Sequence, residues 1–181
     1  MSTSATSFDT LSVRAPEAAK LSHTIRVQSQ SISEGEMIDK EFAFTGCGGK
    51  NRSPQLSWSG APAGTKSYVV TCFDPDAPTG CGYWHWLAFD IPASTTTLEA
   101  GAGTDKSPAG GKSGYTDYGF SSYGGPCPPK GDAAHRYIFR VYALDVEKLE
   151  GAGAGTTGAA LTFMMRGHVL ASGSLTATFG H

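Results

Sequence analysis

Two aspartates, two prolines and a histidine lie close together near the middle of the chain. Asp74–Pro78 (DPDAP) follows a run of β-branched and aromatic residues and precedes Trp84–Trp86 (WHW). Each proline fixes φ at about −65° and lacks an N–H donor, so the strand must end and the chain must turn. We therefore expect Asp74 to project from a strand end and Asp76 to cap the turn. The sequence leaves open whether the Ala77–Pro78 bond is cis or trans.

A second polar cluster follows a stretch rich in glycine and proline. Gly124–Gly131 (GGPCPPKG) leads into His135-Arg136-Tyr137. A glycine pair lets the backbone approach a ligand and aim N–H groups at an anion, while the prolines stiffen the loop. His135 and Tyr137 are two residues apart in a predicted strand and should share a face. Arg136 alternates with them and should face solvent or pair with a surface carboxylate.

Together the two clusters could bind an anion. Two imidazoles and a phenol can donate to one ligand, and a hydrogen bond from an imidazolium is about twice as strong as a neutral one. A carboxylate at Asp74 would repel an anion unless it is protonated, pairs with an imidazolium or meets a ligand ammonium. We expect it to pair with one histidine. Phosphate-type ligands should then bind more tightly near about pH 6 than near about pH 8.

A sheet is needed to bring these groups together. Period-two and continuous apolar patterns predict strands at 24–27, 37–44, 55–58, 67–73, 84–91, 135–144 and 174–179. The 67–73 run is apolar on both faces and belongs in the centre of a sheet. Apolar residues at spacings of three and four predict one short helix within 159–171. The glycine-rich stretch 98–130 lacks a period and is expected to wall the site.

Composition narrows the class of protein. The 181 residues suit one domain, with residues 1–20 as a tail and 21–181 as the fold. Fourteen Lys and Arg against sixteen Asp and Glu give a net charge of −2, which makes nucleic acid an unexpected partner. Charged residues make up 17%, and 24 glycines with 10 prolines favour short strands over long helices. The sequence shows no transmembrane run or signal-peptide core, so we expect a cytoplasmic protein.

The cysteines carry no recognisable motif. Cys47, Cys72, Cys81 and Cys127 include no CxxC pair. Because disulfides are rare in cytosolic chains, we expect four unpaired thiols.

The two polar clusters resemble the paired signature of the phosphatidylethanolamine-binding protein family. The matching segments are FDPDAP and WHW in the first cluster, and GP, PPKG and HRY in the second, at 73–78, 84–86, 125–126, 128–131 and 135–137. The short gap between the two parts and the WHW spacing resemble the bacterial, Raf-kinase-inhibitor-like branch. The likeness extends over about residues 21–179.

The resemblance implies a mainly β fold: a β-sandwich of two antiparallel sheets, with a short C-terminal helix and a small anion-binding pocket at one end. In the family that pocket accepts phosphate-like anions and phosphorylated head groups. Carried over residue by residue, the ligand-binding set is Asp74, His85, His135 and Tyr137, with Trp84, Gly125 and Pro126 at the rim. The sequence departs from the family in two loops: eukaryotic members have a longer segment at 79–83, and Cys127 interrupts the proline-rich loop. Contacts that relatives make with protein partners through those loops are therefore not carried over.

We therefore predict a non-enzymatic protein that binds a small phosphorylated or anionic ligand and needs no cofactor. The GxSxG motif of serine hydrolases is absent. Family names imply regulation of a protein kinase or a protease, and bacterial relatives suggest a homodimer. One alternative is an inhibitor that acts through its surface at 98–130 and has a vestigial pocket. A less favoured one is an iron or zinc enzyme that uses His85, His135 and Asp74 as ligands.

Overall fold

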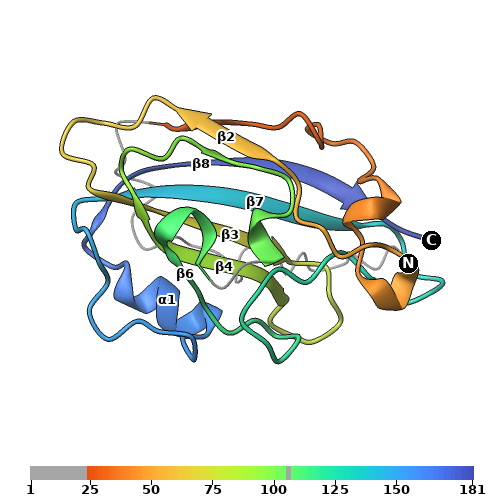
Figure 1. Ribbon diagram of the computed structural model, residues 1–181. Coiled ribbons are helices and arrows are strands. Elements are labelled where there is room, and N and C mark those ends of the chain that lie inside the picture. The colour runs from red at the N-terminus through yellow and green to blue at the C-terminus, as the bar shows by residue number, and fades with distance from the viewer. Residues whose placement is uncertain (1–23, 105–106) are drawn as a thin grey trace, which may run out of the picture.

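The computed structural model describes residues 24–104 and 107–181, and its strands form two antiparallel sheets. The smaller sheet has the order β1-β2-β5, with β1 at Arg26–Gln28, β2 at Leu56–Ser59 and β5 at Thr97–Leu98. The larger has the order β6-β4-β3-β7-β8, with β6 at Lys112–Ser113, β4 at Tyr83–Pro92, β3 at Ser67–Asp74, β7 at His135–Leu144 and β8 at Val169–Phe179. Figure 1 shows the smaller sheet lying over one face of the larger, which is the predicted β-sandwich.

The helical elements are short. One α-helix, α1 at Gly158–Met164, lies on the other side of the large sheet from β2 (Figure 1). Four single turns of 3-10 helix complete the set in the described ranges: η2 at Lys40–Phe42, η3 at Thr45–Cys47, η4 at Ala102–Thr104 and η5 at Pro108–Gly110. Strands and short turns therefore dominate, as the glycine and proline content predicts.

Two apolar layers hold the sandwich together. The inner one lies between the sheets and includes Trp58, Trp86 and Tyr137. The outer one lies under α1 and includes Leu87 and Leu161. All eight residues of β3 are buried because the two layers cover both of its faces, which confirms the prediction for 67–73.

Two predicted elements are wrong in type or extent. The 37–44 stretch is not a strand: the Asp39 carboxylate accepts the Glu41 N–H and caps η2. The helix predicted within 159–171 ends at Met164, and Gly167 with φ +84° lets the chain reverse into β8. That strand consequently begins at Val169, five residues before the predicted start at 174.

The predicted tail at 1–20 lies outside the described residues. The peptide bonds of the described part are all trans, including the one between Ala77 and Pro78.

Candidate functional site

Antiparallel pairing gathers the predicted residues at one end of the large sheet. β3 ends at Asp74, which pairs with Tyr83 at the start of β4. On the other side of β3, Phe73 pairs with Ile138 near the start of β7. The end of β3 and the starts of β4 and β7 therefore meet at the same end of the sheet. The first residues of β4 and β7 lie beside Asp74.

A β-bulge turns His85 toward the inner layer. Cys72 pairs with Trp86 and Phe73 pairs with Trp84, so His85 is an extra residue opposite a single step of β3. The ring of His85 packs edge-on against the inner-layer Tyr137, with centroids 5.0 Å apart. His85 and the outer-layer Leu87 are two residues apart, so strict alternation would put them on one face; the bulge instead re-aims the side chains on either side of it.

Asp74 is the centre of the cluster. Its Oδ2 accepts a hydrogen bond from His135 Nδ1 at 2.8 Å and lies 4.0 Å from His85 Nε2. Its Oδ1 accepts the N–H groups of Asp76 and Ala77, so the same carboxylate also caps the turn. The Asp74 side chain is only 3% exposed and that of His135 6%. The expected pairing of Asp74 with one histidine is present, and the partner is His135.

His85 is held in a defined orientation. Its Nδ1 donates to the Gly124 carbonyl at 2.7 Å, and the Gly124 N–H donates back to the His85 carbonyl at 2.8 Å. Because a carbonyl can only accept, Nδ1 carries the proton and Nε2 faces Asp74. Burial lowers the pKa of His85, against the opposing effects of Gly124 and Asp74. The charged imidazole expected from the sequence is therefore not favoured at this position.

Tyr137 supplies a buried hydroxyl. The residue has no exposed surface, and its Oη has no hydrogen-bond partner among the described residues. Burial, with the Asp74 carboxylate adding to it, raises the pKa of Tyr137 far above its ordinary value, so the hydroxyl stays protonated. The nearby Cys127 amide opposes this shift but is not positioned for a normal hydrogen bond. The hydroxyl is thus a donor without an acceptor.

The structure does not bring Trp84 into this cluster. Its half-buried ring packs on Phe73 and lines a shallow hollow on the outer side of the sheet together with Ile138 and Tyr142. That face is opposite to the one occupied by His85. The sequence motif places these neighbouring residues in one site, but adjacent residues of a strand point to opposite faces of the sheet.

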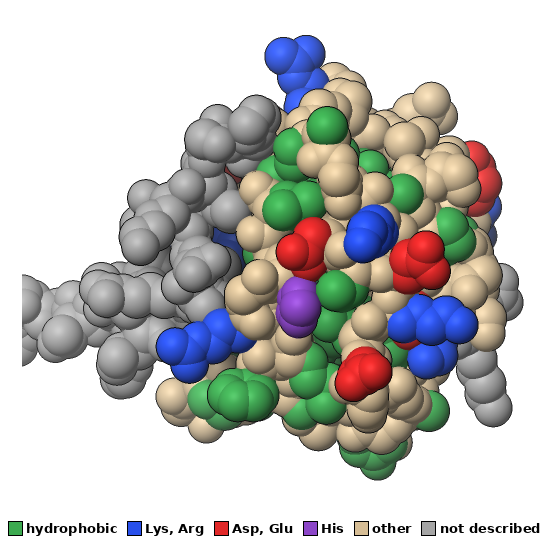
Figure 2. All heavy atoms as spheres, turned by 90° about the vertical axis from the view of Figure 1, so that its left-hand side faces the viewer, with side chains coloured by type: hydrophobic (Ala, Val, Ile, Leu, Met, Phe, Trp, Pro, Cys, Tyr) green, Lys and Arg blue, Asp and Glu red, His purple; other side chains and the backbone are tan. Residues whose placement is uncertain are grey.

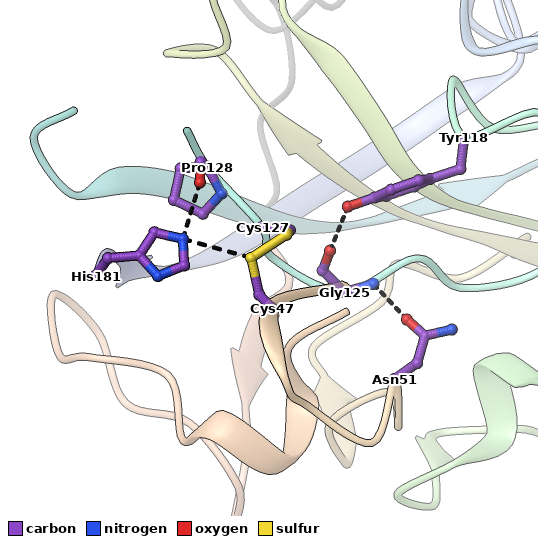
Figure 3. Close-up of a disulfide and its surroundings, with 7 residues drawn as sticks. All are labelled: Cys47, Asn51, Tyr118, Gly125, Cys127, Pro128 and His181. Atoms are coloured by element: carbon purple, nitrogen blue, oxygen red, sulfur yellow. Dashed lines mark hydrogen bonds between the residues drawn. A yellow bond between two sulfur atoms is a disulfide. The ribbon is translucent and has the colours of Figure 1, made fainter. Parts of the chain in front are cut away.

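Gly125 and Pro126 shape the loop beside His85. They offer no free N–H group to an anion, because proline has none and that of Gly125 is already bonded. The Gly125 N–H donates to Asn51 Oδ1 at 2.7 Å, and its carbonyl accepts the Tyr118 hydroxyl at 2.7 Å (Figure 3). The Pro126 carbonyl accepts the N–H of Phe44. A Cβ on Gly125 would lie 2.2 Å from a backbone oxygen, so only glycine fits. Asn51 and Tyr118 lie outside both motifs, and no local sequence pattern indicates their role.

A disulfide joins this loop to η3, which corrects the expectation of four free thiols. Cys47 and Cys127 are bonded, whereas Cys72 and Cys81 are free. Figure 3 shows His181 beside the bridge, 3.4 Å from Cys47 Sγ. The two cysteines are 80 residues apart in the sequence, and no spacing motif indicates such a bond. Disulfides are uncommon in the cytosol, so this one weighs against the expected cytoplasmic location.

Asp76 does not cap the turn, as expected from the sequence, because Asp74 takes that role; the Asp76 carboxylate pairs with Arg136 instead. Its carboxylate accepts from Arg136 Nε at 2.9 Å, from Nη2 at 2.7 Å and from the backbone N–H at 2.8 Å. These contacts lower the pKa of Asp76. The predicted pairing of Arg136 with a surface carboxylate is confirmed, and this pair fixes the start of β7 against the turn after β3.

Within the described ranges, no group of three or more His, Cys, Asp or Glu residues has the arrangement of a metal site. No helix there is long and apolar enough to cross a bilayer.

Comparison of this sequence with known protein families and curated proteins identifies its relatives. A family model described as phosphatidylethanolamine-binding protein matches residues 28–180. The chain belongs to the phosphatidylethanolamine-binding protein family. Among curated relatives, the UPF0098 proteins YbcL and YbhB of Escherichia coli are 43% and 45% identical over 159 residues. The matches cover 85% and 86% of this chain, and 86% and 99% of the relatives.

Solved structures of the phosphatidylethanolamine-binding protein family share the fold. The crystal structure of E. coli YbcL, described as a new member of the mammalian PEBP family, has a TM-score of 0.83 at 42% identity and covers 87% of this chain and 98% of its own. A homologue from Chlamydia trachomatis has a TM-score of 0.75 at 33% identity, with the same coverage of both chains. Family membership and the β-sandwich are thereby confirmed; the homodimer and the kinase or protease partner stay predictions.

Proposed function

We propose that this protein binds a small phosphorylated or otherwise anionic ligand at the cluster formed by Asp74, His85, His135 and Tyr137, without a chemical step. The observation that carries the proposal is the Tyr137 hydroxyl, a buried donor with no partner beside a buried histidine–aspartate pair. An unsatisfied buried polar group costs about 1–3 kcal/mol. A ligand oxygen that accepts from Tyr137 would recover that cost.

The Asp74 carboxylate is compatible with an anion because it is already engaged. Its Oδ2 accepts from His135, and its Oδ1 accepts from two backbone amides. The other ring nitrogen of His135 lies 3.5 Å from Asp132 Oδ2. The three donors that Asp74 accepts offset part of its charge, which lessens its repulsion of an anion.

The groups nearest the cluster favour binding over catalysis. The Tyr137 hydroxyl stays protonated and is a weak nucleophile. Burial also raises the pKa of the Cys72 thiol on β3, which keeps it from forming a reactive thiolate. Membership of a family named for binding phosphatidylethanolamine agrees with a binding role.

Calorimetric titration with inorganic phosphate tests the proposal. The wild-type protein should bind phosphate, and Tyr137→Phe should weaken binding about 5- to 30-fold through loss of one hydrogen bond. His168→Ala is the matched control, because His168 forms an exposed pair with Asp145 elsewhere in the molecule and should leave the affinity unchanged. Equal affinities of the wild type and Tyr137→Phe, or no binding by the wild type, would contradict the proposal.

A further inference from the structure

We propose that the Cys47–Cys127 disulfide is a site of reversible thiol exchange, at which a small thiol becomes joined to Cys127 while Cys47 leaves as a thiolate beside His181. The inference does not depend on the proposed function, because it uses none of the residues of that cluster. It follows from the access to the two sulfurs and from the group that contacts one of them.

The disulfide is partly accessible to solvent. Both cysteines are half-buried, and Gly46 and Gly48 on either side of Cys47 are exposed. Gly46 also leaves room at the other sulfur, since a Cβ at this position would lie 3.9 Å from Cys127 Sγ. A small thiolate can therefore approach Cys127 from the side on which Gly46 has no side chain.

His181 distinguishes the two sulfurs. Its Nε2 lies 3.0 Å from the Pro128 carbonyl oxygen and 3.4 Å from Cys47 Sγ (Figure 3). Because a carbonyl can only accept, Nε2 carries a proton, and the same N–H faces the Cys47 sulfur. The ring also packs edge-on against Phe179, with centroids 6.2 Å apart, which helps to hold it there. Of the two sulfurs, Cys47 Sγ is thus the one that an imidazole N–H contacts.

This asymmetry decides which sulfur is attacked. In thiol exchange the incoming thiolate bonds to one sulfur, and the electron pair of the old S–S bond leaves on the other as a thiolate. A neighbouring histidine N–H stabilises a thiolate, and a stabilised thiolate leaves faster. Cys47 is therefore the leaving group, and Cys127 forms the mixed disulfide. A second small thiolate can attack that bond and release the Cys127 thiolate. Two small thiols are then oxidised to their own disulfide, and their protons end on the two cysteines.

Noncovalent contacts keep the two cysteines close after the bond opens. The Phe44 N–H donates to the Pro126 carbonyl at 3.0 Å. Phe44 lies three residues before Cys47, and Pro126 directly precedes Cys127, so this hydrogen bond joins the same two segments as the disulfide. The Cys47 thiolate consequently stays near Cys127, where it can attack the mixed disulfide and expel the small thiol. The exchange is therefore reversible in the folded protein.

The test exposes the folded, oxidised protein to reduced glutathione, followed by acid quenching and mass spectrometry of its peptides. All samples carry Cys81→Ser, since Cys81 is an exposed free thiol that would also exchange. Most of the trapped glutathione should be on Cys127, with Cys47 as the free thiol. A bond that stays closed until the protein unfolds, or an adduct mainly on Cys47, would overturn the inference.

His181→Phe tests the positioning role of the imidazole, because it removes the N–H and keeps an aromatic ring. Opening of the bond should slow about 3- to 10-fold, and the adduct should divide more evenly between Cys47 and Cys127. Tyr118→Phe is the matched control: it removes a hydrogen bond to Gly125 of the same loop and leaves His181 in place, so the division should not change. An unchanged rate and division in His181→Phe would also overturn the inference.

Discussion

Two histidine–aspartate pairs stand at opposite ends of the same sheet. His135 and Asp74 are joined at 2.8 Å where β3 ends and β7 begins, while His168 and Asp145 are joined at 2.9 Å where β7 ends and β8 begins. The first pair has side chains 6% and 3% exposed, and the second 43% and 44%. Figure 2 shows the second end, where a histidine lies among surface side chains of both charges. Nearly the same contact is thus buried at one end and solvated at the other.

The difference shows that burial, and not the pair itself, makes a candidate site. Water can satisfy every polar atom around an exposed pair, and such pairs contribute about 1 kcal/mol or less. At the buried end the Tyr137 hydroxyl has no hydrogen-bond partner among the described residues, so unfilled hydrogen-bonding capacity remains there. The segments that cover this end, η3 and the loop at 124–131, are cross-linked by the Cys47–Cys127 disulfide.

The largest expected effect comes from that cross-link. Replacing both Cys47 and Cys127 by Ser should lower the free energy of unfolding by about 4 kcal/mol, since the bond closes a long loop in the unfolded chain. Urea unfolding of the oxidised wild type and the double variant measures it. Amide exchange should also quicken at 125–131 and stay unchanged at 166–169. A loss below about 1 kcal/mol would mean that the noncovalent contacts of Asn51 and Tyr118 are enough to hold the loop.

Removing the carboxylate of each pair compares the two ends directly. Asp74→Ala should cost about 3 kcal/mol, because it leaves a buried imidazole and two backbone N–H groups without their acceptor. Asp145→Ala should cost about 1 kcal/mol or less, since water replaces the lost contact. Denaturant unfolding of the two variants gives both values. Similar losses at the two ends would refute the view that burial separates them.

A smaller effect should appear in the pH dependence of stability. The pKa of His85 is lowered in the folded protein, so the unfolded chain takes up a proton first as the pH falls below about 6.5. Stability should therefore decline from that pH down to the folded-state pKa, below which both states are protonated. His85→Gln, which can still donate to Gly124, should flatten this part of the profile. Thermal unfolding at several pH values measures it, and an unchanged slope in the variant would exclude His85 as the cause.

The sequence predicts some parts of this molecule and misses others for identifiable reasons. The unbroken apolar run of β3 identified a central strand, and the two motifs identified Asp74, His85, His135 and Tyr137, which the structure brings together. Periodicity could not show that a bulge turns His85 away from the face of Leu87 and onto the inner face with Trp86. The Cys47–Cys127 bond depends on a contact between residues 80 positions apart, which no local pattern records.

The central claim is that a small anion binds at the buried pair and not at the exposed one. The most direct measurement is a phosphate titration followed through the imidazole nitrogen resonances of protein labelled with ¹⁵N at histidine. The resonances of His85 and His135 should shift and saturate with a single affinity, while those of His168 stay in place. Saturable shifts at His168 with His85 and His135 unmoved, or no saturable shift at any of the three, would contradict the account.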